Sequence, residues 1–286
     1  MQRYVKNSSV AKFIKLKLPA MLKSFPKCII FALTKFIKMK HSEYFNKRHT
    51  VRKYTDGQIP ETLLKEMIEA AAHAPNTGNM QWYSVVVTRD AANKRRLAPA
   101  HFNQPSVEGA SAVLTFCLDL NRFEQWCRLN SANPGFENFQ SFVAAVIDTS
   151  LFAQQFCTIA EMNGLGTCYL GTTTYNAPDI AKVLELPERV VPVTTVTVGY
   201  PETQAGPTWR LPVEAVMHEE TYRRPTDEDI RRWYAPLEQE SQHFVEENAK
   251  QSLAQVFTDI RYPRESAEYF SKVYAGLLDA NKFPLK

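Results

Sequence analysis

The sequence predicts a fold that mixes α-helices with β-strands, either α/β or α+β. Three compact runs at 82–90, 111–120 and 189–201 are rich in β-branched residues and bounded by polar or turn residues, as strands are. Segments with helical spacing lie between and around them, which argues against an all-helical or all-β protein. With 286 residues and 44% apolar composition, the chain can bury a core in one large domain or two small ones.

Two segments carry clear helix patterns. Residues 59–75 have the spacing of one amphipathic helix that ends before its final proline. Its apolar positions are Leu63, Leu64, Met67, Ile68 and Ala71. The second segment, 139–162, is apolar over most of the helix circumference. Such a helix must be buried, either in the core of the chain or against a second subunit.

Positions 1–38 form a basic arm with nine Lys or Arg residues and no acidic residue. Three interpretations stay open: translation starts at Met39, the arm lies as an amphipathic helix on an anionic membrane surface, or it is a signal or disordered segment. Its apolar stretch is far shorter than the ~20 residues that a membrane span needs. Without the arm, 25 basic side chains stand against 30 acidic ones, so the folded body has the wrong sign for binding nucleic acid.

The cysteines favour a reducing, cytoplasmic location, because they are odd in number, include no CxxC pair and give no disulfide framework. Metal binding finds no support, since the six histidines show neither HExxH nor HxH spacing. We expect Cys168 to be a buried thiol rather than a nucleophile. We expect Asp148, which has apolar neighbours, to be a hydrogen-bonded helix residue rather than a ligand.

Beyond the last predicted strand, the sequence changes to a proline-rich loop followed by polar helical stretches near 227–253 and 266–280. These late helices are expected to be too polar to form a core of their own. We therefore predict three parts: the basic arm at 1–38, a body at 39–224, and a C-terminal extension at 225–286. The extension is expected to wrap the body or a partner subunit.

The stretch RHTVRKY at 48–54 gathers two guanidinium groups, an imidazole and a hydroxyl group within five residues. In an extended segment Arg48, Thr50 and Arg52 lie on the same side, because side chains alternate with period two. Guanidinium forks match phosphate oxygens bidentately, so this cluster can hold a phosphate. The alternative is a solvated basic turn before a helix.

Two further segments are candidates for ligand contacts. The loop APNTGNMQW at 74–82 offers three side-chain amides, which address both donors and acceptors on a heterocycle edge. A polar turn with local hydrogen bonds is the alternative. The segment GLGTCYLGTT at 164–173 has GxGxxxxG spacing and follows a helix, so it is neither a Rossmann fingerprint nor a P-loop. Gly164 and Gly166 are expected to cap that helix, and Gly171 to let the backbone approach a ligand.

Taken in order, these segments resemble the FMN-dependent nitroreductase family. RHTVRKY is similar to the family motif R-x-S/T-x-R-x-aromatic, and PNTGNMQW is similar to its amide loop, with Trp82 where a proline is usual. GLGTCYLG followed by VVPVTTVTVGYP resembles the third and fourth signatures. RLPVEAVMHEETYRRP resembles the branch of NADPH-dependent nitro and flavin reductases that carries a C-terminal extension. The resemblance covers roughly Arg48 to Arg224.

The resemblance implies a set of FMN-binding residues. The ribityl phosphate and chain would be held by Arg48, Thr50 and Arg52, with His49 beside them and Arg210 from the extension. The flavin ring or its ribityl hydroxyls would be addressed by Asn79, Gln81 and Gln104, with Asn76 and Thr77 reaching across from the other subunit. The backbone along the ring near N5 would be that of Tyr169, Leu170, Gly171 and Thr172. Thr208 stands where the family usually has Lys, so phosphate affinity is expected to be lower unless another cation substitutes.

The implied fold is an α+β three-layer sandwich, with a central, mostly antiparallel sheet flanked by helices and FMN at a homodimer interface. The implied reaction takes two electrons from NADPH or NADH, through FMN, to nitroaromatics, quinones or flavins by a ping-pong mechanism. No side chain is expected to act as acid, base or nucleophile, because the flavin carries the redox chemistry.

Two questions stay open at this stage. Arg261 and Arg264 are candidates for binding the 2′-phosphate of NADPH, with a solvated loop as the alternative. A specialised flavin reductase or dehydrogenase on the same fold is an alternative function. So is a peripheral membrane or binding protein that acts through the basic arm.

Overall fold

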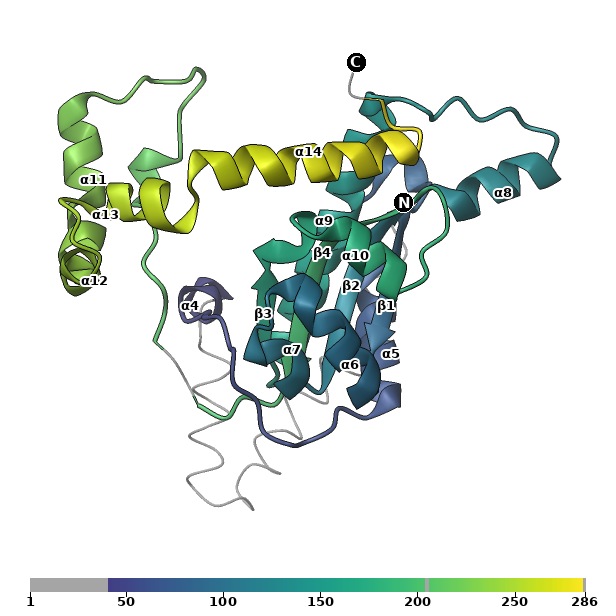
Figure 1. Cartoon of the computed structure of the whole chain (residues 1–286), viewed down its shortest axis with the longest axis horizontal. Helices are drawn as coiled ribbons and strands as arrows, with labels where there is room; N and C mark the ends of the chain where they lie inside the picture. Colours follow the sequence, from purple (N-terminus) through teal and green to yellow (C-terminus); the bar gives the residue numbers. More distant parts are fainter. Residues whose placement is uncertain (1–40, 204–205, 285–286) are drawn as a thin grey trace, which may run out of the picture. The chain divides into compact units, whose positions relative to one another are not determined.

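The computed structural model describes residues 41–203 and 206–284 (Figure 1). These residues fall into two units. The described part of the first unit ends at His49, is joined by Gly206–Thr208, and holds helix α4 (His41–Asn46). The second unit begins at Thr50 and holds all the strands of the described residues. The basic arm predicted at 1–38 lies outside the described residues.

A four-stranded sheet forms the centre of the second unit. Its strands are β1 (Tyr83–Thr88), β2 (Ala112–Asp119), β3 (Gly166–Leu170) and β4 (Val190–Gly199), in the order β1-β2-β4-β3. Every neighbouring pair is antiparallel. The three strands that the sequence predicts are confirmed as β1, β2 and β4. Strand β3 falls in the glycine-rich segment, for which the sequence predicts no strand.

The sheet is the middle layer of a three-layer arrangement. Strands β2 and β4 are buried along their whole lengths, so their side chains pack on both faces of the sheet. On one face, Leu114 and Phe116 of β2 join the core beneath helices α5 (Glu61–Ala71) and α9 (Phe139–Met162). Val113, which precedes Leu114 in the strand, belongs to a separate core cluster on the other face. The predicted α+β sandwich is therefore confirmed.

Short helices cover this second face. They are α6 (Ala91–Leu97), η2 (Ala98–His101), α7 (Pro105–Gly109), η3 (Gly171–Thr174) and α10 (Ala177–Val183). Their buried apolar side chains, such as Leu97 and Ile180, pack with Val113, Cys168 and Leu170 of the sheet. Because η2 and η3 belong to this layer, they lie next to the end of β3.

Helix α9 buries one face and exposes the other. Phe152 and Phe156 on the buried face contact Phe116 of β2. Large apolar side chains on the other face are exposed, with Phe139 at 50% and Ile147 at 53%. Among the described residues, α9 is the one helix long and apolar enough to cross a membrane, but its contacts with α5 and the sheet make it the core helix of this unit.

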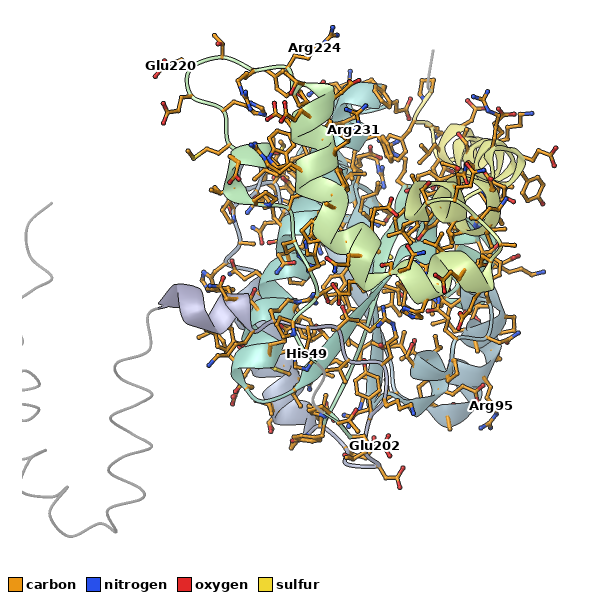
Figure 2. All side chains as sticks on the ribbon, turned by 90° about the vertical axis from the view of Figure 1, so that its left-hand side faces the viewer. His49, Arg95, Glu202, Glu220, Arg224 and Arg231 are labelled. Carbon is orange, nitrogen blue, oxygen red and sulfur yellow. The ribbon has the colours of Figure 1, made fainter. Side chains whose placement is uncertain are left out.

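The region after β4 is mostly helical. Its elements are η4 (Val213–Ala215), α11 (Asp227–Glu240), α12 (Gln242–Glu247), α13 (Leu253–Gln255), the π-helix η5 (Val256–Arg261) and α14 (Arg264–Ala280). Buried Val245, Leu253 and Val256 form a small core from α12 to η5. The expectation that the late helices form no core of their own is therefore wrong for this part. Glu220 and Arg224 project from the loop that precedes α11 (Figure 2).

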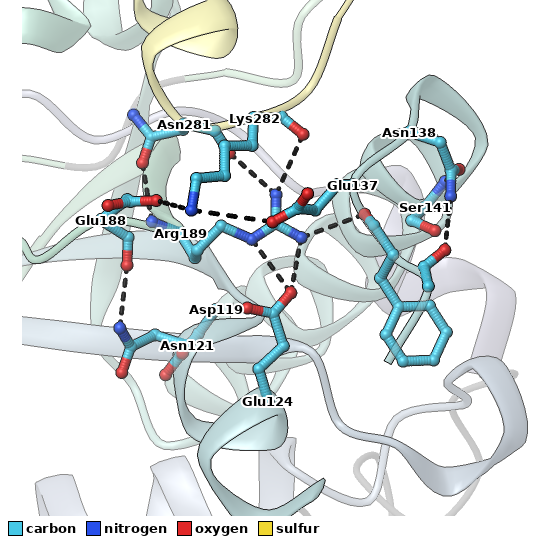
Figure 3. A network of polar contacts seen from close by, with 12 residues as sticks. Asp119, Asn121, Glu124, Glu137, Asn138, Ser141, Glu188, Arg189, Asn281 and Lys282 are labelled. Carbon is cyan, nitrogen blue, oxygen red and sulfur yellow. Dashed lines mark hydrogen bonds and ion pairs between the residues drawn. The ribbon is translucent and has the colours of Figure 1, made fainter. Parts of the chain in front are cut away.

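A network around buried Arg189 joins the end of α14 to the sheet (Figure 3). Arg189, just before β4 and 3% exposed, donates from Nε and Nη2 to Oε1 of Glu124 at 3.0 and 2.7 Å. Glu124 belongs to helix α8 (Asn121–Leu129). The same guanidinium donates to the main-chain carbonyls of Phe136, Asn281 and Lys282. One arginine thus joins α8, the sheet and the residues that follow α14.

Candidate active site

Thr50 and Arg52 lie beside strand β3. The backbone N–H of Val51, between them, donates to the carbonyl of Thr167 in β3 at 3.0 Å. Val51 is buried, whereas Arg52 is exposed and Thr50 is half-buried. The alternation turns the two predicted phosphate residues away from the core, as expected for an extended segment.

The three glycines around β3 have different roles. Gly164, with φ +77°, follows the end of α9 as the predicted cap. Gly166 is not a cap but lies inside β3, where a Cβ would come within 2.5 Å of the Val51 Cβ. The cap prediction for Gly166 is therefore wrong, because the close approach of residue 51 requires the glycine. A Cβ at Gly171 would meet only Tyr169 Cε1, at 4.0 Å, so the backbone is open there.

A polar cluster follows the end of β3. Leu170 is 1% exposed, Tyr169 is 60% exposed, and the chain then turns into η3. Oγ1 of Thr172 lies 3.0 Å from Nδ1 of His101 and 3.4 Å from Nε2 of Gln104. The structure therefore brings together the predicted residues Gln104 and Thr172 and adds a histidine to them.

Sequence reasoning did not single out His101. Its side chain is fully buried, and burial lowers its pKa to about 4, so the imidazole is neutral at physiological pH. Within the described part of the chain, its Nε2 has no hydrogen-bond partner. The sequence gives little signal, because a single histidine between two prolines belongs to no motif.

The amide loop between α5 and β1 has an unusual backbone. Gly78 and Asn79 both have φ 57°, and Gln81 has φ 54°. Oδ1 of Asn76 accepts from the backbone N–H of Gln81 at 3.4 Å. Exposed Gln81 lines a hollow of about 490 Å³ together with Met80 and several residues of β1, α5 and α9. Non-glycine residues with positive φ are costly, and such strain is typical of functional loops.

Asp148 of α9 anchors this loop. Its Oδ1 accepts hydrogen bonds from both the backbone N–H and the hydroxyl group of Thr77, each at 2.9 Å. Asp148 is 1% exposed, so the expectation of a hydrogen-bonded helix residue is confirmed. Its Oδ2 has no partner among the residues that the structure describes.

The amide loop and the polar cluster lie at opposite edges of the sheet. The loop leads into β1 and the cluster follows β3, and β2 and β4 stand between these two edge strands. Three inter-strand spacings separate the edges by roughly 14 Å. One chain therefore places the two groups of predicted residues at opposite edges of the sheet and does not bring all of them together.

The remaining predicted cofactor residues are described by their local contacts. Arg48 and His49 belong to the first unit, where the backbone N–H of Arg48 donates to the carbonyl of Phe45 at 3.1 Å. His49 Nδ1 lies 3.2 Å from the carbonyl oxygen of Lys47. In the second unit, Arg210 donates from Nη1 to the preceding carbonyl at 2.8 Å.

The two arginines considered for NADPH lie at the junction of η5 and α14. The guanidinium of Arg261 stands over the ring of Phe244, 4.5 Å from its centroid. Arg264 is paired with Glu268 at 3.8 Å in an exposed position. Among the residues that the structure describes, neither arginine is hydrogen-bonded to the polar cluster, and their role toward the 2′-phosphate stays a prediction.

Cysteine and metal chemistry do not mark this site. Cys168 is 1% exposed, so the expectation of a buried thiol is confirmed. Within residues 41–203 and 206–284, no group of three or more His, Cys, Asp or Glu side chains could hold a metal ion. The donors that remain are guanidinium, amide and hydroxyl groups, which suit an anionic and heterocyclic ligand.

Residues 46–200, more than half of the chain, match the profile described as "Nitroreductase family". The chain belongs to the nitroreductase family. The matched range includes both edges of the sheet and every predicted site residue except Arg210, Arg261 and Arg264. The nitroreductase assignment agrees with the resemblance of the four sequence segments.

Similar proteins with named activities and a similar solved structure support this assignment. The chain is 33% identical over 181 residues to an FMN reductase (NADPH) of Bacillus subtilis, covering 63% of this chain and 73% of that protein. It is 30% identical over 181 residues to an oxygen-insensitive NADPH nitroreductase of Salmonella typhimurium, covering 63% and 73%. A candidate oxidoreductase from Bacteroides fragilis superimposes with a TM-score of 0.83 at 49% identity, covering 85% of this chain and 99% of that one.

Proposed function

We propose that this chain is an FMN-dependent oxidoreductase that takes two electrons from NADPH or NADH and passes them to small aromatic acceptors. Nitroaromatics, quinones and free flavins are the acceptor classes. The relatives named as an FMN reductase and an NADPH nitroreductase support this activity. A single observation in the structure carries it: a polar cluster at the end of β3 that fits the ring and hydroxyl groups of a flavin.

The cluster fits such a ligand because of how its donors are arranged. Nδ1 of buried His101 and Nε2 of Gln104 both lie within hydrogen-bond distance of Oγ1 of Thr172. When both nitrogens donate, the Thr172 hydroxyl keeps its own proton for an acceptor outside the cluster. Beside it, the open backbone at Gly171 and the exposed ring of Tyr169 leave room for a flat ring.

The residues flanking the cluster supply the charge that the phosphate of FMN needs. Arg52 and Thr50 stand beside β3 through the Val51 contact and would hold the ribityl phosphate. Arg210 of the same unit would add a further charge-assisted contact. The roles of Arg48 and His49 toward the phosphate stay predictions of the family resemblance. Tyr169, Leu170 and Gly171 would lie along the ring. FMN, when bound, supplies a carrier for two electrons, so the chain itself needs no acid, base or nucleophile.

The second half-site would come from a partner. The predicted residues of the amide loop lie at the opposite edge of the sheet from the polar cluster; they are Asn76, Thr77, Asn79 and Gln81. A twofold dimer can bring the β1 edge of one chain next to the β3 edge of the other. The exposed apolar side chains of α9 are suited to such an interface, because large exposed apolar patches mark association sites. We therefore propose a cytoplasmic homodimer with two composite sites.

A purified full-length protein tests the proposal. We expect it to be yellow, to release FMN on heat denaturation, and to oxidise NADPH when a nitroaromatic, a quinone or free FMN is added. Screening these acceptors one by one under steady-state NADPH oxidation identifies the preferred class. A colourless protein that neither binds added FMN nor oxidises either nicotinamide with any acceptor would refute the function.

The order of substrate binding provides a second test. The donor and the acceptor must each reach the same ring, so NADP⁺ has to leave before the acceptor enters. We expect parallel lines in double-reciprocal plots of rate against NADPH at several acceptor concentrations. Intersecting lines would show a complex of enzyme, donor and acceptor together, and would refute the shared pocket.

A further inference from the structure

Three aromatic rings join the C-terminal helix α14 to the polar cluster. The ring of Phe270 in α14 stacks on Tyr175, with centroids 4.7 Å apart and an interplanar angle of 12°. The same ring meets Phe102 edge to face at 6.1 Å, and Phe102 lies 6.4 Å from Tyr175. Phe102 follows η2 and Tyr175 follows η3, so Phe270 contacts both segments that build the polar cluster.

The segment that carries Phe102 has a strained backbone. Phe102 has φ 54° and Asn103 has φ 53°, two consecutive non-glycine residues in the left-handed region. Such residues are strained and persist only where surrounding contacts fix them. Local hydrogen bonds from the N–H groups of Phe102 and Asn103 to Pro99 and Ala98 fix the backbone in part. From outside the turn, the Phe102 ring is contacted by both Tyr175 and Phe270, and Phe270 stacks on Tyr175 as well.

The strained turn leads directly to the residues of the proposed site. Gln104 follows Asn103 and contacts Thr172 at 3.4 Å, and His101 precedes Phe102 and contacts Thr172 at 3.0 Å. Asn176 joins the same two segments, because its side-chain amide donates to the carbonyl of Ala100 at 2.9 Å. A shift of Phe102 or Tyr175 therefore moves the donors around the Thr172 hydroxyl.

We propose that Phe270 is a positioning residue through which the C-terminal helix α14 fixes Gln104 and Thr172 in the flavin site. Phe270 lies outside residues 46–200, so this contact comes from the part of the chain that the family profile does not match. We call the contacts of Phe270 with Phe102 and Tyr175 the clamp. The inference rests on the proposed function for its effect on FMN, but the clamp itself does not depend on that function. The aromatic contacts, rather than the bulk docking of α14, hold the half-site in its binding geometry.

The clamp is tested first without reference to flavin. In full-length Phe270→Leu, we expect faster hydrogen exchange of the amides of Phe102, Asn103, Gln104 and Tyr175, all of which donate to backbone carbonyls. The matched control is Leu277→Ala, which weakens α14 where it packs on the Trp82 and Leu118 cluster. Unchanged exchange in Phe270→Leu, or the same acceleration in the control, would overturn the clamp.

Release of FMN from the purified holo-protein tests the positioning role. Free flavin fluorescence after dilution should rise about 2- to 10-fold faster in Phe270→Leu, because an aromatic pair is worth about 0.5–1.5 kcal/mol. Phe270→Tyr keeps the ring and should release FMN at the wild-type rate, as should Leu277→Ala. If the rate of FMN release correlated with thermal stability in all three variants, Phe270 would have a structural role only. A wild-type protein without FMN would refute the proposed function and leave the exchange result to decide on the clamp.

Discussion

Arg52 is the residue whose replacement tests the phosphate site most directly. It is exposed and beside β3, so Arg52→Ala leaves the fold intact but removes a charge-assisted partner of a dianion. We expect FMN affinity to fall by about 1.5–3 kcal/mol, roughly 10- to 150-fold in Kd. Titrating FMN-depleted protein by fluorescence quenching gives the value. The neighbouring exposed Lys53→Ala is the control, and equal losses in both variants would assign the effect to general charge.

His101 makes stability depend on pH. Its pKa is about 4 in the folded chain and 6.5 in the unfolded chain, so only the unfolded chain takes up a proton between these values. The free energy of unfolding therefore falls as the pH drops from 6.5 to 4, by up to about 3 kcal/mol from this residue.

His101→Asn removes this titration and keeps a short polar side chain near Thr172. We expect the variant to lose less stability than the wild type between pH 6.5 and 4, as measured by urea unfolding at several pH values. Identical slopes in the two proteins would show that His101 takes up a proton as readily in the folded chain as in the unfolded chain.

For single residues, the sequence predicted much of the site chemistry but did not predict the part of His101. Gln104 and Thr172 were assigned through the resemblance, and the structure places them in contact. His101 has no such signal, because its importance comes from a long-range contact to η3 and from burial. Neither property is written in the residues next to it.

Among the elements, the end of α14 depends on the Arg189 network. Arg189→Met leaves Glu124 buried without its partner, which is expected to cost about 3–5 kcal/mol of unfolding free energy. The control is Lys282→Met, because its pairs with Glu137 and Glu188 are about half exposed and are therefore expected to contribute little to stability. Urea unfolding measures both variants. Adding Glu124→Gln to Arg189→Met should restore part of the loss, and no restoration would contradict a buried-charge penalty.

Two elements show where sequence patterns stop being informative. Strand β3 is only five residues long, begins at Gly166 and has no alternation long enough to stand out. The core of α12 to η5 takes single apolar residues from several short helices, so no one helix looks amphipathic enough. In contrast, β1, β2, β4 and α9 have long, regular patterns, and they are confirmed.

For the whole molecule, the exposed apolar face of α9 is expected to decide oligomeric state. Ile147→Glu places a charge on that face, and a twofold interface carries the change twice. We expect the dimer Kd to rise by about 100-fold or more, since burying each isoleucine contributes about 1.5–3 kcal/mol. Sedimentation equilibrium measures it. Ala91→Glu, at an exposed position of α6, should leave association unchanged. A dimer unaffected by Ile147→Glu would place the interface elsewhere.

The separation of the two half-sites at opposite sheet edges has a consequence for mixtures of defective chains. In the proposed dimer, Arg52→Ala would damage the half-site beside β3 and Asn76→Ala would damage the loop before β1, so homodimers of either variant would have two broken sites. In a heterodimer of the two variants, both defects fall in one site and the other site is built from intact halves. Denaturing and refolding the variants together should therefore restore FMN binding to about a quarter of the sites, by complementation between subunits.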